Sequence, residues 1–151
     1  MKALKETGRY EVDAEVLAKI NETFIGFCAD EAQTAQTILA NKKDSDYLID
    51  THTAVACSAA VQYRADMPAD DRVTVIASTA SPYKFPYDVI ESLGEKASDN
   101  AFECLDKLSA LTSTDIPAPL ARLKNAEVRF KETVGRETAE LWAAAERFIT
   151  K

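Results

Sequence analysis

The sequence predicts an α/β fold: a three-layer αβα arrangement with a small, mainly parallel sheet and additional helices at the C-terminal end. Three observations lead to this fold class. Over residues 1–94, short apolar runs alternate with helical patterns in the order strand, helix, strand, helix, strand. Each connection has the length of a right-handed crossover between parallel strands. Residues 95–151 have mainly helical spacing of apolar side chains. We expect residues 1–151 to form a single domain, or a fragment of one, because three strands are few for this class.

The N-terminal region is expected to begin with helical turns. A short helix or turn ends at Gly8, and apolar residues at helical spacing predict a helix over residues 13–22. The run TFIGFC, residues 23–28, is short and apolar. A run of this length favours a buried strand, the first of the three.

A capped helix follows the first strand. Asp30 is a preferred N-cap residue, and Gln33 stands where the return partner of a capping box belongs. The helix is expected to continue to about Ala40. The next apolar run, residues 47–49, is predicted to be the second strand.

The third helix and the third strand complete the βαβαβ part. Asp50 is the expected N-cap of a long helix over residues 51–64, whose many small side chains suit close packing. A polar turn over residues 66–71 ends this helix. The β-branched run at residues 73–77 is predicted to be the third strand.

The C-terminal part is expected to be mainly helical. Pro86 suits the first position of a short helix over residues 86–93, and Gly94 suits the position after its end. Asp99 is the expected cap of the next helix. The remaining expected elements are a helix over 118–124, a strand or extended segment over 127–130, and a helix over 136–149 that packs through Leu141, Trp142, Ala145 and Phe148.

Composition limits the function classes. The chain has 151 residues, 46% of them hydrophobic, a net charge of −7 and a pI near 4.8, which argues against a nucleic-acid partner. The three cysteines, Cys28, Cys57 and Cys104, lack metal-site spacing and are expected to be buried free thiols. The single histidine cannot supply a metal cluster. No run is long and apolar enough for a membrane span, and no signal pattern is present, so a soluble, cytoplasmic protein is expected.

Polar side chains follow each of the three predicted strands. They lie at residues 29–30, at residues 50–53 and at residues 78–81. In open parallel sheets, ligands bind at the carboxyl ends of the strands, where helix N-termini also attract anions. We therefore expect these segments to form one polar rim.

Most residues of this rim have an ordinary structural interpretation. Asp30 and Asp50 are expected to be helix caps, and His52 a structural hydrogen-bonding residue. Lys84 is expected to be a solvated or ion-paired loop residue. Thr79, directly after an apolar strand, is the residue placed best to contact a ligand. The sequence contains no phosphate-binding glycine motif, no nucleophile elbow and no HExxH motif.

Two blocks of the sequence resemble one known family. YLIDTHTAVA, residues 47–56, resembles the DPHTAVA block of threonine synthases, and STASPYKFP, residues 78–86, resembles the TAxPxKFP block that follows it in that family. The preceding FIGFCADEAQTAQTI and the later LARLKNAEVRF are also similar to the family's C-terminal region. The resemblance covers nearly all of the chain and is most specific over residues 24–94. Thr51 stands where the family has proline, at the first helical position, which threonine tolerates at modest cost.

The resemblance implies a function for the complete enzyme. Threonine synthases are pyridoxal-phosphate enzymes of fold type II, the tryptophan-synthase-like class. They act as carbon–oxygen lyases on a phosphate ester, converting O-phospho-L-homoserine and water to L-threonine and phosphate. By the family pattern, the Thr79 hydroxyl contacts the pyridine nitrogen of the cofactor, and residues 1–151 resemble the C-terminal portion of a fold-type-II large domain.

The same resemblance implies that this chain is incomplete as an enzyme. The family's cofactor-binding lysine and glycine-rich phosphate loop have no counterpart in this sequence, and Lys84 is not assigned as that lysine. We therefore expect no catalytic residue and no metal ligand here, no activity from the chain alone, and the N-terminal part of the same enzyme as its partner. Exposed apolar surface could also drive self-association into a homo-oligomer.

Two alternative functions remain open from the sequence. The chain could be a self-contained α/β module, binding or regulatory, that uses the polar rim for a small anion. It could also be an aldolase-like enzyme that uses Lys84 to bind a carbonyl compound. The second alternative ranks last, because nothing around Lys84 supplies the apolar burial that lowers the pKa of an amine.

Overall fold

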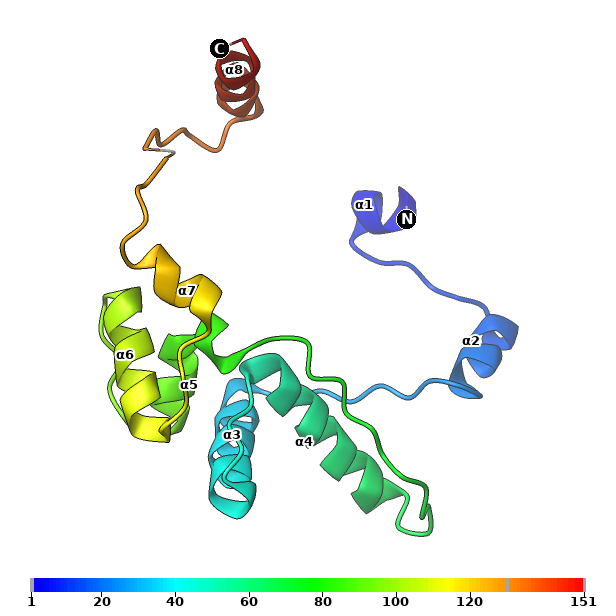
Figure 1. Ribbon diagram of the computed structural model, residues 1–151. Coiled ribbons are helices and arrows are strands. Elements are labelled where there is room, and N and C mark those ends of the chain that lie inside the picture. Colours follow the sequence, from blue (N-terminus) through cyan, green and yellow to red (C-terminus); the bar gives the residue numbers. More distant parts are fainter. Residues whose placement is uncertain (1, 130, 151) are drawn as a thin grey trace. The chain divides into compact units, whose positions relative to one another are not determined.

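The computed structural model describes residues 2–129 and 131–150, and its regular elements are all helices (Figure 1). The elements, in order, are α1 (Lys2–Thr7), α2 (Ala14–Asn21), α3 (Glu31–Ser45), α4 (Thr51–Asp66), the 3₁₀-helix η1 (Pro82–Lys84), α5 (Pro86–Ser92), α6 (Ala101–Thr112), α7 (Ala118–Leu123) and α8 (Thr138–Ile149).

The predicted fold class is wrong. The expected three-layer αβα fold with a parallel sheet, part of a fold-type-II large domain, is not what the chain adopts: residues 2–129 and 131–150 contain no strand. Residues 23–28, 47–49 and 73–77 are turns or irregular segments instead. A strand exists only where a neighbouring strand receives its backbone hydrogen bonds, and a β-branched sequence cannot provide that neighbour.

Burial differs among the three segments that were predicted to be strands. Val73 and Val75 are 91% and 87% exposed, whereas Ile76 of the same segment is 38% exposed, so the third segment buries only part of its apolar surface. Leu48 and Ile49 are only 9% and 4% exposed, although they are not in a strand. They lie in the connection between α3 and α4, which pack against each other. The hydrophobic pattern therefore identified burial correctly at residues 48–49 and wrongly at Val73 and Val75.

Two of the three predicted helix caps, Asp30 and Asp50, are confirmed, and the structure adds Asp13, which the sequence analysis did not name. Asp30 caps α3, and Gln33 completes the capping box as expected, with hydrogen bonds of 2.7 and 2.9 Å. Asp50 caps α4 and Asp13 caps α2. The fourth cap is Asn100 of α6, whose side chain accepts from the backbone N–H groups of the first turn, so the expectation for Asp99 was wrong by one residue.

The described chain forms two compact units, divided between Ile116 and Pro117. In the first unit, α3 packs against α4 and α5, and α5 packs against α6. The fully buried apolar residues of this core are Ile38, Ala54, Val89, Ile90, Cys104 and Leu108. They come from all four helices, so the core of the first unit is a helix–helix interface.

The second unit contains α7 and α8. The predicted packing face of α8 remains half or more exposed: Leu141, Trp142 and Phe148 are 50%, 67% and 64% exposed. Residues 127–129 are not a strand. The last residue of that predicted segment, Phe130, lies outside the described residues.

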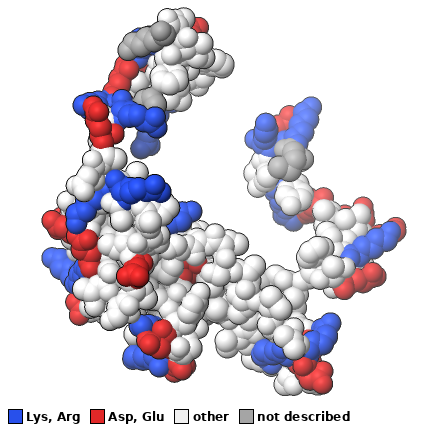
Figure 2. All heavy atoms as spheres, viewed as in Figure 1, with Lys and Arg blue, Asp and Glu red and all other residues white. Residues whose placement is uncertain are grey.

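Charges of both signs are distributed over the surface, and the three cysteines differ in burial. Figure 2 shows cationic and anionic side chains interspersed on the face in view. No helix in the described part of the chain is long and apolar enough to cross a membrane. All three cysteines are free, but only Cys104 is fully buried, while Cys57 is half-buried and Cys28 is exposed. Burial raises the pKa of the Cys57 thiol.

The irregular segment after α4 runs back along that helix (Figure 1). Arg64, near the end of α4, donates to the carbonyl oxygens of Asp70 and Arg72 and, at 2.7 Å, to the hydroxyl of Thr74. The Asp70 carboxylate also accepts from Arg72 at 2.7 and 2.8 Å and from the Tyr63 hydroxyl, and these contacts hold its pKa well below the usual range. One end of the segment is thereby fixed to the C-terminal turns of α4.

Candidate functional site

The first turn of α4 meets the STASPYKFP block at a chain of three polar side chains. Asp50 is fully buried and caps the helix, accepting from the backbone N–H of His52 at 2.9 Å. Thr53, 4% exposed, donates its hydroxyl proton to the second oxygen of that carboxylate. The hydroxyl oxygens of Thr53 and Ser78 lie 3.0 Å apart. Two blocks that are separate in the sequence are therefore joined at this point.

The direction of these hydrogen bonds follows from the number of protons. An ionised carboxylate only accepts, whereas a threonine hydroxyl has one proton to donate and two lone pairs. Because the proton of Thr53 goes to Asp50, the Ser78 hydroxyl must donate to the oxygen of Thr53. The buried charge of Asp50 thus orients both hydroxyl groups.

The pKa of Asp50 reflects the balance of burial and hydrogen bonding. Burial alone would raise the pKa of this carboxyl group, because it penalises the charged form. The hydrogen bonds from Thr53 and from the backbone N–H groups of His52 and Thr53 outweigh burial and hold the pKa below its ordinary value. Asp50 is therefore a buried anion whose charge is satisfied by its own helix.

His52 is held at the edge of the same cluster. Its Nδ1 atom lies 3.2 Å from the Asp50 carboxylate and 3.4 Å from the Thr51 hydroxyl. Its ring packs against Phe85 with centroids 4.8 Å apart and an interplanar angle of 47°. The imidazole is exposed, so this packing orients the ring without burying it. These contacts place His52 in hydrogen-bonding distance of Asp50 and Thr51 at the start of α4.

Thr79 and Lys84 are both exposed. Thr79 directly follows the tethered Ser78, and no hydrogen bond of its hydroxyl is found within the described part of the chain. Lys84 ends η1, which begins at Ser81, where the serine hydroxyl accepts from the N–H of Tyr83 at 3.3 Å. Thr79 therefore presents a neutral donor and acceptor to the surroundings, beside a fixed neighbour.

The N-termini of α3 and α4 share a shallow hollow of about 380 Å³. Its lining residues are Ala29, Glu31, Thr34, Thr51, His52, Val55 and Asp88. Two of the three predicted rim segments line this hollow, and the third joins them through Ser78. The rim was expected at the end of a sheet, but capped helix starts bring its segments together instead.

Three residues that shape this region were missed from the sequence. Phe85, which packs against His52, and Asp88, which lines the hollow, come from the end of the STASPYKFP block and the first turn of α5. Tyr83 is 5% exposed, and its hydroxyl lies 2.8 Å from the carbonyl oxygen and the hydroxyl oxygen of Thr114. The aromatic residues Tyr83 and Phe85 of this block were the available signal, because aromatic side chains commonly anchor a loop by burial.

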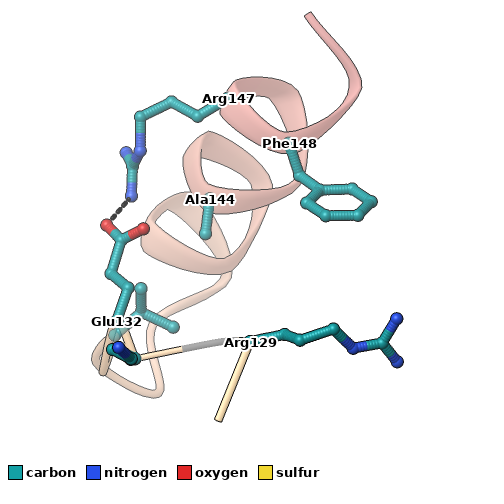
Figure 3. Close-up of a pocket in the computed structure, with 7 residues that line it drawn as sticks. Arg129, Glu132, Ala144, Arg147 and Phe148 are labelled. Atoms are coloured by element: carbon teal, nitrogen blue, oxygen red, sulfur yellow. Dashed lines mark hydrogen bonds and ion pairs between the residues drawn. The ribbon is translucent and has the colours of Figure 1, made fainter. Parts of the chain in front are cut away.

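A second hollow, of about 680 Å³, lies within the C-terminal unit. Arg129, Lys131 and Arg147 contribute cations to it, but Arg147 is paired with Glu132 at 2.6 Å. Figure 3 shows the Arg129 guanidinium extending away from that ion pair. An anion site needs cations that converge, so this arrangement does not make one. No group of three or more potential metal ligands occurs among the described residues either.

The donor set near Thr79 fits one contact to a heteroaromatic cofactor. An exposed neutral hydroxyl can donate to a ring nitrogen or accept from it, and no carboxylate competes for the Thr79 hydroxyl in the described residues. The sequence contains only four glycines and no phosphate-binding glycine motif. The sequence itself therefore offers no loop of the kind that holds a cofactor phosphate.

Comparison with known proteins finds a family and a similar solved structure. Residues 53–149 match a family model described as threonine synthase, C-terminal. A solved structure of PLP-bound threonine synthase from Brucella melitensis is similar, with a TM-score of 0.53 and 26% sequence identity. The similarity covers 69% of this chain and 22% of the Brucella chain, so the matched region is a minor part of that protein. A search of curated proteins found no match.

Proposed function

The chain belongs to the threonine synthase family, of which it represents the C-terminal region, and we propose that it contributes Thr79 to the cofactor site of a complete threonine synthase. The observation that carries the proposal is the exposed Thr79 hydroxyl, which directly follows a serine tethered to the buried Asp50 carboxylate. That placement gives a hydroxyl with a fixed backbone neighbour and freedom to bind a group from elsewhere.

The proposed reaction is the conversion of O-phospho-L-homoserine and water to L-threonine and phosphate. Bound pyridoxal phosphate would supply the electron sink for this chemistry. Thr79 would hold the pyridine nitrogen with a neutral hydroxyl, which does not force that nitrogen to be protonated as a carboxylate would. His52 and Lys84 would remain outside the proton transfers, with His52 shaping the start of α4.

The remainder of the enzyme is the proposed partner. Several large apolar side chains are exposed in both units, among them Phe24, Val73, Val75, Trp142 and Ile149. Exposed apolar surface of this extent is typical of an interaction site. In the proposed assembly, the N-terminal part covers these side chains and provides the lysine and the phosphate loop. Without it, the surface could mediate self-association.

Reconstitution tests the proposed function. The chain alone should release no phosphate from O-phospho-L-homoserine, and the chain combined with the N-terminal part of a threonine synthase should do so. Release by the chain alone, or no release from a folded combination, would contradict the proposal. Saturable binding of inorganic phosphate to the isolated chain would favour the alternative of a small-anion module.

Substitution of Thr79 tests the cofactor contact directly. In the complete enzyme, Thr79→Val should weaken pyridoxal phosphate binding about three- to tenfold, because a neutral hydrogen bond contributes roughly 0.5–1.5 kcal/mol. Thr79→Ser should retain the affinity, and Thr79→Asp should change the absorbance spectrum of the bound cofactor. Binding is measured by absorbance titration, with Thr37→Val as a control, because among the described residues the Thr37 hydroxyl donates to the Gln33 carbonyl of its own helix. Unchanged affinity in Thr79→Val would exclude this contact.

The single tryptophan reports the docking of the partner. Trp142 is 67% exposed, so its fluorescence in the isolated chain should have the emission maximum of a solvated indole. Addition of the N-terminal part should shift that maximum to shorter wavelength, because docking removes water from the ring. An emission maximum that stays the same in an active combination would show that α8 lies outside the docking surface.

A further inference from the structure

We infer that Asp50 is a positioning residue, which fixes the backbone of Thr79 through the hydroxyl groups of Thr53 and Ser78. This role for Asp50 rests on the proposed function in one respect: the contact of Thr79 with the cofactor. The tether itself is a property of the chain, since Asp50, Thr53 and Ser78 are in contact in the first unit. Its two ends differ in burial, because the carboxylate of Asp50 is fully buried and Ser78 is exposed.

The segment that carries Thr79 has little else to hold it. Residues 73–80 make no backbone–backbone hydrogen bond within the described chain. At one end, Arg64 holds the carbonyl of Arg72 and, at 2.7 Å, the Thr74 hydroxyl. The apolar side chains Val73 and Val75 are almost fully exposed, and Ile76, at 38% exposed, is the apolar side chain of the segment that is partly covered. Among the described residues, the hydrogen bond between Ser78 and Thr53 is therefore the side-chain hydrogen bond that holds the segment between Thr74 and η1.

Asp50 anchors the tether and also sets the donor and acceptor roles of the Thr53 and Ser78 hydroxyl groups. A neutral chain of hydroxyl groups could reverse its donors and acceptors, but the carboxylate only accepts. Hydrogen bonds to an ionised acceptor are also stronger than neutral ones. The Asp50 charge therefore fixes the rotamer of Thr53 and, through it, the position of Ser78 and the next residue.

The ordering of Thr79 can be measured without cofactor. Backbone order parameters from NMR relaxation of the chain should be near 0.8 at Thr79 in the original sequence and fall below about 0.6 in Thr53→Val and in Ser78→Ala. Thr53→Ser keeps the hydroxyl and should restore the order, and Thr37→Val should leave it unchanged. Circular dichroism confirms that each variant keeps its helices. Should Thr53→Val fail to fold, Ser78→Ala still tests the tether, because Ser78 is exposed.

The complete enzyme gives the second readout. Thr53→Val and Ser78→Ala should each weaken pyridoxal phosphate binding about threefold to tenfold, and the double variant should be no weaker than either single one, because they break the same connection. Thr53→Ser should recover the affinity.

The outcomes separate the tether from the proposed function. An unchanged order parameter at Thr79 in folded Thr53→Val and Ser78→Ala chains would overturn the tether, whatever the enzyme assays give. Loss of order at Thr79 without any change in cofactor affinity would leave the tether standing but would overturn the positioning role of Asp50. Failure of Thr79→Val to affect cofactor binding would count against the proposed function alone.

Discussion

Replacing Leu108 with alanine should lower the free energy of unfolding of the chain by about 3 kcal/mol. Leu108 is fully buried in α6, the helix that packs against α5. Truncation removes apolar contacts and leaves a cavity that the surrounding helices fill only in part. Urea unfolding followed by circular dichroism at 222 nm measures the change.

The control for this substitution lies one turn along the same helix. Leu111 is 41% exposed, so Leu111→Ala should cost less than about 1 kcal/mol, partly offset by the higher helix propensity of alanine. Both variants change helix propensity equally, so the difference between their free energies of unfolding reports the effect of burial. Equal effects at Leu108 and Leu111 would contradict the assignment of the α5–α6 interface as part of the core.

Replacing Asp50 with alanine should have an effect of similar size, about 3 kcal/mol. Loss of an N-cap costs about 1 kcal/mol, and leaving buried hydrogen-bonding partners unsatisfied costs roughly 1–3 kcal/mol more. The partners that lose their acceptor are the N–H of His52 and the buried hydroxyl of Thr53. Thermal and urea unfolding of the chain, compared with the original sequence, give the difference.

Asp30 provides a matched control, because it caps α3 in the same way but is exposed. Asp30→Ala should cost only about 1 kcal/mol, since water replaces the lost acceptor. A cost for Asp50→Ala no larger than that for Asp30→Ala would show that burial of the Asp50 cluster adds nothing to stability.

The stabilisation by Asp50 should depend on pH with a definite sign. Its folded-state pKa lies below its ordinary value of 3.8, so folding favours the ionised carboxylate. The ionisation-linked contribution is fully present above about pH 3.8 and is lost as the pH falls through the folded-state pKa. The gap in unfolding free energy between the original chain and Asp50→Ala should therefore stay constant from neutral pH down to the ordinary pKa and narrow below it. Asp70 also has a lowered pKa, but it is present in both chains and cancels in the comparison.

The sequence by itself determined the main helices, the starts of α3 and α4, and the family. Asp30 with Gln33, and Asp50 before the long helix, act through hydrogen bonds to residues two or three positions along the chain. Such local interactions depend only on nearby residues, so their pattern can be read without the fold. The blocks at residues 47–56 and 78–86 likewise identify the family, because a resemblance of this kind depends on the order and identity of residues alone.

The tertiary structure alone decided which extended segments would be strands and which polar groups would meet. The β-branched run at residues 73–77 was predicted to be a strand, but strand pairing needs a neighbour that the local sequence does not contain. The contact between Thr53 and Ser78 spans 25 positions, and no local pattern indicates it. The physical reason is the same in both cases: a helix satisfies its own backbone hydrogen bonds within one turn, whereas a strand and a tether depend on groups that the fold must bring from far along the chain.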